Sequence, residues 1–373
     1  MSVFAWGANS YGQLGLGFRT DEVNIPQFVN LSKAIESGNT DLKRIKSIWG
    51  GGGHTLILTE EGSVYGCGLN NIGQLGSNSH GVITDVIRLK ELDDYCIVSL
   101  CSTWDSCYAI TEDGLCIGWG SNVYSQLGKP MDKVVNSEKP IVLSEDALQV
   151  ACGVRHCIIL VHNGKVLSSG DYKYGQLGRK VAILDHTFSE VIGLKNIELI
   201  SCGFNHSFAL NESGEMYGWG VNKWGQLGID PTDCKTIAKP VLIPLNKDYN
   251  IQEIHCGWSS THLLADNGVL INFGRNNYGQ LGNGTTKNRW QPQELEGFTF
   301  QKISVGSEHC LGMNERGKLF SWGWNEHGSC GNGNSDDVLK PTKLHFEGHK
   351  KFKFFTAAVG HNFVITENNK PQK

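Results

Sequence analysis

A tetrapeptide that recurs along the whole chain constrains its fold more than any other feature. Gly-Gln-Leu-Gly stands at residues 12–15, 73–76, 175–178, 225–228 and 279–282, and the variants Ser-Gln-Leu-Gly and Gly-Ser-Cys-Gly stand at 125–128 and 328–331. The steps between successive copies are 61, 52, 50, 50, 54 and 49 residues. Seven copies at a nearly constant period indicate a repeat architecture in which each copy is one supersecondary unit.

Each repeat predicts four short strands. An aromatic residue before glycine ends one strand, as at Trp6 and Trp219, and is expected to fill the space between neighbouring units. The strand that closes each repeat carries Cys-Gly-x-x-His, as at residues 202–206. Glycine accounts for 47 of the 373 residues and suits turns that need a positive φ. Four strands make one propeller blade, so the sequence predicts an all-β fold, a seven-bladed β-propeller of four-stranded blades. The absence of a 3.6-residue period excludes a helical solenoid.

The two ends of the chain carry complementary halves of one repeat. The chain enters the pattern in mid-repeat at Phe4, and the missing half stands at residues 357–365. We therefore expect the N- and C-terminal strands to pair in one blade and close the ring, which leaves few free strand edges. On this interpretation residues 1–367 form a single domain and residues 368–373 form a short C-terminal tail.

Composition excludes several classes of partner. The formal net charge is −4 and charged residues make up 19% of the chain, so no strong positive field is available for nucleic acid. No apolar run approaches the roughly 20 residues that span a bilayer, and the N-terminus lacks the basic and apolar regions of a signal peptide. We expect a monomer in the cytoplasm and also in the nucleus, with protein partners rather than nucleic acid or a membrane.

The cysteines are interpreted as reduced residues of an intracellular protein. The chain has 12 cysteines, of which Cys101, Cys152, Cys202 and Cys256 are taken as one position of the repeat. Equivalent positions on different blades are expected to lie too far apart for a disulfide, so these side chains are expected to act as small buried apolar groups.

Motifs of catalysis are missing from the sequence. It has no Gly-x-Ser-x-Gly elbow, no Walker loop and no His-Glu-x-x-His. No Cys-x-x-Cys pair is present that would suit zinc. We therefore predict no enzymatic activity, no catalytic residue, no cofactor and no metal site.

Gly-Gln-Leu-Gly together with Cys-Gly-x-x-His resembles the regulator of chromosome condensation family of propellers, and the resemblance covers essentially the whole chain. Residues 4–17 and 321–331 are similar to the branch whose members are guanine nucleotide exchange factors that regulate secretion. The resemblance implies a propeller that regulates a small GTPase through its Gly-x-x-His loops. The segment around Trp324 also resembles family members that dock a small metal-binding protein of the diphthamide and tRNA-modification pathways, which implies the alternative of a non-catalytic adaptor.

The family resemblance implies a ring of candidate partner-binding residues inside the Gly-x-x-His loops. In the family this loop contacts the small GTPase with acidic and histidine side chains. The matching candidates here are Trp104, Asp105, Arg155, Phe204, Asn205, Trp258 and Glu308. The alternative for the three aromatic residues is that they pack together over the central channel. Trp104 and Trp258 stand three blades apart, so the sequence predicts no tryptophan cluster of the kind a light receptor needs.

Two further groups of residues belong to the predicted site. The repeated histidines are interpreted as structural, because a residue present in most blades usually serves the blade itself; they are His54, His156, His206, His309 and His361, while Ser106 and Ser260 replace the histidine in two repeats. Trp324, Glu326 and His327 depart from the repeat pattern. We interpret these three as a docking point for one partner or as a turn specific to that blade.

Overall fold

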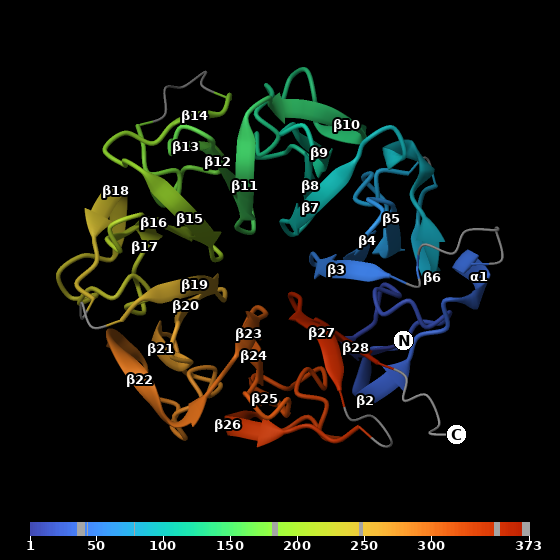
Figure 1. The fold of residues 1–373 in the computed structure, drawn as a ribbon. Helices are drawn as coiled ribbons and strands as arrows, with labels where there is room; N and C mark the ends of the chain where they lie inside the picture. Colours follow the sequence, from blue (N-terminus) through green and yellow to red (C-terminus); the bar gives the residue numbers. More distant parts are fainter. Residues whose placement is uncertain are drawn as a thin grey trace.

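The computed structural model describes residues 1–35, 42, 44–77, 79–180, 186–245, 249–346 and 351–367. Within these residues the strands form seven antiparallel four-stranded sheets arranged as blades around one axis (Figure 1). Helical structure in the described part is limited to α1 (Ser32–Ile35), the 3-10 turn η2 (Lys90–Leu92) and the 3-10 residue Leu42. The seven-bladed β-propeller that the repeat predicts is therefore confirmed. The predicted tail at 368–373 lies outside the described residues.

The first three blades follow one another along the chain. Blade 1 consists of β3 (Ile45–Gly50), β4 (His54–Thr59), β5 (Val64–Leu69) and β6 (Val82–Arg88). Blade 2 consists of β7 (Ile97–Ser102), β8 (Ser106–Thr111), β9 (Cys116–Ser121) and β10 (Asn136–Ser144). Blade 3 consists of β11 (Ala147–Cys152), β12 (His156–Val161), β13 (Val166–Gly170) and β14 (Ser189–Glu190).

The remaining blades repeat this order. Blade 4 consists of β15 (Ile197–Cys202), β16 (His206–Asn211), β17 (Met216–Val221) and β18 (Thr236–Leu242). Blade 5 consists of β19 (Ile251–Cys256), β20 (Ser260–Ala265), β21 (Val269–Gly274) and β22 (Arg289–Thr299). Blade 6 consists of β23 (Lys302–Val305), β24 (His309–Met313), β25 (Leu319–Gly323) and β26 (Val338–Lys343). Blade 7 consists of β27 (Phe352–Ala357), β28 (His361–Thr366), β1 (Ser2–Ala8) and β2 (Glu22–Phe28).

Blade 7 closes the ring with strands from both ends of the chain. The sheet order is β2-β1-β28-β27, and β1 pairs antiparallel with β28 so that Phe4 lies opposite Val364 and Gly7 opposite His361. Figure 1 shows β27 with the first strands of the other six blades around the axis. The predicted closure is confirmed, and it ties the last blade to the first.

The core lies between blades, where the tryptophan that precedes glycine at the end of a blade's third strand is buried. The indole N–H of Trp119 donates to the backbone carbonyl of Gln74 at 3.0 Å, and that of Trp219 donates to the carbonyl of Gln176 at 2.9 Å. Each indole belongs to one blade and each glutamine to the preceding blade. The rings therefore supply apolar contact and a directed hydrogen bond at the same interface.

The Gly-Gln-Leu-Gly turn is built by side chains that satisfy its own backbone. The side-chain oxygen of Asn222 accepts a hydrogen bond from the N–H of Leu227, and that of Gln226 accepts one from the N–H of Trp224. The first glycine of the motif has a positive φ, 75° at Gly175, and Ser125 adopts the same conformation at 59°. That region is rare for residues other than glycine, which explains the motif's composition.

The strand pairing corrects our interpretation of Cys101. Cys152 lies opposite Cys157, whereas Cys101 lies opposite Tyr108. The residue of blade 2 that matches Cys152 is therefore Ser102, which lies opposite Cys107. A shift of one residue turns a side chain to the other face of its strand, and the thiol of Cys101 interacts with that of Cys152 on the neighbouring blade. All twelve cysteines are free.

Helices long and apolar enough to cross a bilayer are not found among the described residues.

Ring closure gives a direct test of the fold. A chain that ends at Ala358 lacks β28, so β1 and β27 both lose their pairing partner. We expect this truncation to abolish the cooperative thermal transition followed by circular dichroism. A chain that ends at Glu367 is the control and should keep its midpoint within about 2 °C. A cooperative transition in the shorter chain would contradict closure by β28.

Candidate functional site on the Gly-x-x-His face

Two sets of loops emerge on one face of the propeller. The Gly-x-x-His loop joins the first strand of a blade to the second, and the Gly-Gln-Leu-Gly loop joins the third strand to the fourth. Because the strands are antiparallel, both turns lie at the same end of the blade, as the pairing of His206 with Gly220 requires. We call this surface the Gly-x-x-His face.

The tips of the Gly-x-x-His loops are joined by a belt of backbone hydrogen bonds. The N–H of the first x residue in one blade donates to the carbonyl of the matching residue in the next blade. The bonds run from Gly52 to Trp104 at 2.9 Å, Trp104 to Val154 at 3.4 Å, Val154 to Phe204 at 3.3 Å, Phe204 to Trp258 at 3.2 Å, Trp258 to Ser307 at 2.7 Å and Ser307 to Val359 at 3.0 Å. The belt fixes the backbone and leaves each side chain free to differ.

The repeated histidines are buried and reach across to the next blade. His156 Nε2 lies 2.9 Å from Ser207 Oγ, and the Ser207 hydroxyl donates to the carbonyl of Gln176 at 3.0 Å. Because that proton is already used, the imidazole must donate through Nε2. The Nε2 atoms of the other four histidines make the matching side-chain contact with the next blade: His54 with Cys107, His206 with Thr261, His309 with Asn362 and His361 with Thr55.

Burial keeps these imidazoles neutral. The Nδ1 atoms of His54, His156, His206, His309 and His361 have no hydrogen-bond partner in the structure. A proton on Nδ1 would place a charged donor in a buried site without an acceptor. Desolvation lowers the pKa of His156, His206 and His361 to about 3 and that of His54 and His309 to about 4.

Blade 5 replaces its missing histidine with one that the sequence analysis overlooked. Ser260 occupies the histidine position, and His262 Nε2 lies 3.1 Å from its hydroxyl and 3.8 Å from Cys310 Sγ on the next blade. His262 is buried, and desolvation lowers its pKa to about 3. A histidine two residues beyond the missing one, on the same face of the strand, was the available signal.

The three aromatic candidates form one cluster across the channel. The ring centroids of Trp104 and Trp258 are 5.9 Å apart, and those of Phe204 and Trp258 are 5.3 Å apart. Blades 2 and 5 are as far apart as a seven-membered ring allows, so the contact must span the axis. The alternative that the three aromatic residues pack together over the central channel is confirmed. We call these three residues the aromatic cluster.

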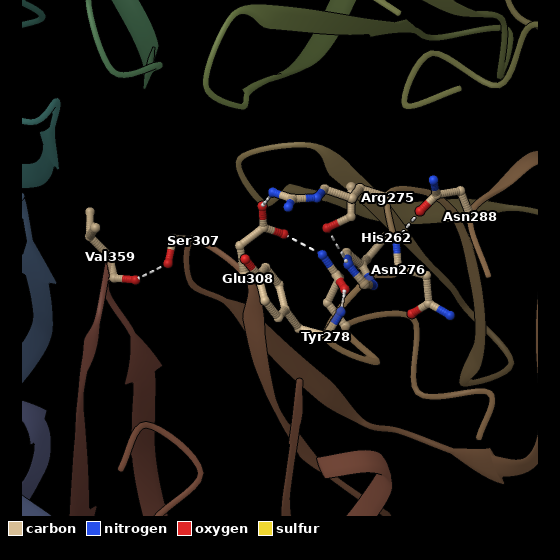
Figure 2. Close-up of polar contacts among 10 residues, drawn as sticks. His262, Arg275, Asn276, Tyr278, Asn288, Ser307, Glu308 and Val359 are labelled. Carbon is tan, nitrogen blue, oxygen red and sulfur yellow. Dashed lines mark hydrogen bonds and ion pairs between the residues drawn. The ribbon is translucent and has the colours of Figure 1, made fainter. Parts of the chain in front are cut away.

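The two acidic candidates differ in exposure. Glu308 is buried with 4% of its side chain exposed, and its carboxylate accepts hydrogen bonds from Arg275 Nη1 at 3.0 Å and from the side-chain amide of Gln280 (Figure 2). Burial raises the pKa of Glu308, and Arg275 opposes the rise. Both carboxylate oxygens are therefore engaged within the chain.

Asp105 remains partly exposed on the face. Burial raises its pKa, while a hydrogen bond from Gln74 and the charge of Arg155 lower it. Arg155 is exposed, and its guanidinium lies 4.4 Å from the ring centroid of Tyr124.

Asn205 occupies the position of Asp105 and Glu308 in blade 4. Its side-chain oxygen accepts a hydrogen bond of 3.4 Å from the amide of Gln176. A glutamine of the preceding blade thus contacts the residue before the histidine position in blades 2, 4 and 6.

The second candidate group adjoins the first. The N–H of Trp324 donates to the carbonyl of Glu308 at 2.9 Å. The Trp324 ring lies 6.2 Å from that of Tyr278 and 5.1 Å from that of His327. Arg275 lies 5.0 Å from the Tyr278 ring centroid, so one continuous set of contacts joins the groups. Glu326 is exposed.

Exposed apolar side chains occur in several loops of this face on blades 2 and 3, and the sequence analysis singled out only Trp104 among them. They lie in the loops after β7, β9 and β13, with 38% to 60% of each residue exposed: Trp104, Val123, Met131, Val135, Tyr172 and Tyr174. Large exposed apolar groups on neighbouring loops of one face are typical of interaction surfaces. We call these six residues the blade 2–3 patch.

The described residues contain no group of three or more histidine, cysteine, aspartate or glutamate side chains that could hold a metal ion.

Comparison with known proteins identifies relatives of the whole fold. The sequence model of the RCC1-like domain matches residues 2–366. The solved structure of Prp20p from Saccharomyces cerevisiae, described together with its binding to Gsp1p and histones, has a TM-score of 0.88 and 25% identity and covers 100% of this chain and 92% of its own.

Curated relatives match over shorter stretches. The secretion-regulating guanine nucleotide exchange factor of Bos taurus is 39% identical over 159 residues, 42% of this chain and 32% of the relative. The probable E3 ubiquitin-protein ligase HERC4 of Rattus norvegicus is 33% identical over 156 residues, 41% of this chain and 14% of the relative. The matched stretches thus span a third or less of these relatives.

The buried histidines predict that stability falls as the pH drops below neutral. Below the ordinary pKa of about 6.5 the unfolded chain binds a proton at each histidine, whereas the folded chain stays neutral down to a pH of about 3 to 4. Each such histidine should remove about 1.4 kcal/mol of stability per pH unit below that value. Urea unfolding at about pH 7.5, 6.5 and 5.5 measures the effect, in a range where most carboxylates stay ionised.

A histidine variant isolates the cause. His156→Gln keeps a side-chain hydrogen-bond donor. It should reduce the slope of unfolding free energy against pH by the contribution of one proton, about 1.4 kcal/mol per pH unit. His345→Gln, at an exposed histidine, should leave the slope unchanged. A midpoint that does not vary between these pH values would contradict the assignment.

The Glu308 pair predicts a large cost when its cation is removed. Arg275→Met leaves a buried carboxylate without its charge partner and should destabilise the fold by about 3 kcal/mol in urea unfolding. Adding Glu308→Gln should recover part of the loss, because the buried group is then neutral. Arg316→Met in an exposed turn is the control. Equal stability of Arg275→Met and the unaltered protein would show that the pair is unimportant.

Proposed function

Because this chain belongs to the RCC1-like domain family, we propose that it regulates a small GTPase by binding it on the Gly-x-x-His face and promoting release of its guanine nucleotide. The observation that carries the proposal is the blade 2–3 patch, on the face that also carries the exposed Arg155 and the partly exposed Asp105. Exposed aromatic and arginine side chains are the residues that dominate binding energy at protein interfaces. The relatives named for nucleotide exchange and for binding Gsp1p support the choice of partner.

Exchange needs no bond-making residue. A protein that binds the nucleotide-free GTPase more tightly than the loaded form shifts the population toward the empty state. The size of this shift is set by the difference between the two binding free energies. Each 1.4 kcal/mol or so of that difference changes the ratio of empty to loaded GTPase about tenfold. The lack of catalytic motifs is therefore consistent with this activity.

Asp105 is the acid best placed to compete with nucleotide. Its carboxylate is partly exposed, whereas that of Glu308 is engaged by Arg275 and Gln280. A carboxylate presented to the lysine and Mg²⁺ that hold the phosphates would favour the empty form. Glu308 is assigned to positioning Arg275 between Trp224 and Tyr278, whose rings lie 5.4 and 5.0 Å from its guanidinium.

The test measures release of a fluorescent GDP analogue from a panel of small GTPases. We expect at least one GTPase to release nucleotide faster in the presence of the protein. Trp104→Ala should weaken binding of that GTPase by about 30-fold, the cost of a hot-spot residue. Asp105→Asn should slow exchange more than it weakens binding. Leu242→Ser, at an exposed apolar residue on β18, is the matched control. If no GTPase is accelerated, the exchange activity is refuted.

Affinity purification separates this function from the adaptor alternative. A GTPase recovered best after nucleotide stripping favours the exchange factor. A small metal-binding protein recovered in stoichiometric amount, and lost in Trp324→Ala, favours an adaptor that docks at Trp324, Glu326 and His327.

A further inference from the structure

The central channel contains a cavity of about 350 Å³. All seven blades contribute their first strand or the following loop to its lining, from Trp49 in blade 1 to Thr356 in blade 7. Pockets for small molecules typically measure about 300 to 1,000 Å³, so the cavity is large enough for one compact ligand.

One end of the cavity is covered by the aromatic cluster. Trp258 contacts both Trp104 and Phe204, and all three residues line the cavity. Gly52 makes room for this arrangement, because a Cβ atom at that residue would lie 2.5 Å from the Trp104 ring.

The wall of the cavity contains a tryptophan that is partly exposed. Trp49 lies on β3 with 41% of the residue exposed, and it lines the cavity. The matching residues of the other blades are smaller: Cys101, Ala151, Ser201, His255, Ser304 and Thr356. A large apolar ring in a wall of small residues supplies a face against which a planar ligand can stack.

The charge of the cavity is carried by one side chain pair. Glu253 and His255 on β19 both line the cavity, and Glu253 Oε2 lies 2.7 Å from His255 Nε2. Glu253 keeps 39% of its side chain exposed. Among the described residues that line the cavity there is no lysine or arginine. The cavity therefore favours a cation over an anion.

We propose that the channel binds a planar aromatic molecule that carries an amino group. The ring stacks on Trp49, and the ammonium group pairs with Glu253. This inference stands on the cavity alone and is independent of the proposed exchange activity.

Two probes with the same ring and opposite charge test the proposal by isothermal titration calorimetry at pH 7.5. Tryptamine carries an ammonium group and indole-3-acetate carries a carboxylate. We expect saturable one-to-one binding of tryptamine, about tenfold tighter than any binding of indole-3-acetate. No saturable binding of tryptamine at millimolar concentration, or equal binding of the two probes, would overturn the proposal.

Variants of the wall place the site. Trp49→Ser introduces the residue that blades 4 and 6 carry there and should weaken tryptamine about tenfold. Glu253→Gln should remove the preference for tryptamine over indole-3-acetate. Glu315→Gln, in an exposed turn, should change neither affinity. Thermal unfolding confirms that each variant is folded, and unchanged tryptamine binding by folded Trp49→Ser and Glu253→Gln would refute the site.

Discussion

At five of the seven blade interfaces, one buried backbone carbonyl accepts two hydrogen bonds from the next blade. The Gln176 carbonyl receives the indole N–H of Trp219 and the hydroxyl of Ser207, and the hydroxyl in turn accepts from His156. Such a chain of bonds is stronger in a buried setting than in water, and it penalises any missing member. The same junction recurs at Gln74 with Trp119 and Cys107, at Gln280 with Trp322 and Cys310, and at Ser329 with Trp6 and Asn362. The residues of the repeat motif thus supply the groups that form this contact.

The interface between blades 2 and 3 departs from that pattern. Ser106 replaces the histidine, and its hydroxyl donates to the backbone carbonyl of Ser121 in the same blade. The Tyr108 hydroxyl donates to the carbonyl of Gln126. At this interface the thiol of Cys101 in blade 2 interacts with the thiol of Cys152 in blade 3. This interface, which departs from the common pattern, thus joins the same two blades that carry the blade 2–3 patch on the Gly-x-x-His face.

The fold could be predicted because the period encodes it, whereas the geometry of the site could not. A single-residue offset hid the environment of Cys101, since β-strand side chains alternate with a period of two. Trp104 and Trp258 are separated by half the ring, yet a narrow channel brings their rings to 5.9 Å. Glu308 matched the expected acid, but nothing in the repeat identified Arg275 as the partner that occupies its carboxylate. Long-range pairing is a property of packing, which spacing along the chain does not specify.

The belt of backbone hydrogen bonds explains how one scaffold accommodates such different residues. The first x residue contributes only backbone atoms to the belt. Gly52, Val154 and Trp258 therefore make the same backbone hydrogen bonds although their side chains differ. Side chains at these positions are consequently available for function, above the face or inside the channel. The aromatic cluster belongs to both regions, since Trp104 is exposed on the face and lines the cavity. A substitution of Trp104 therefore changes both the surface of the face and the lining of the channel.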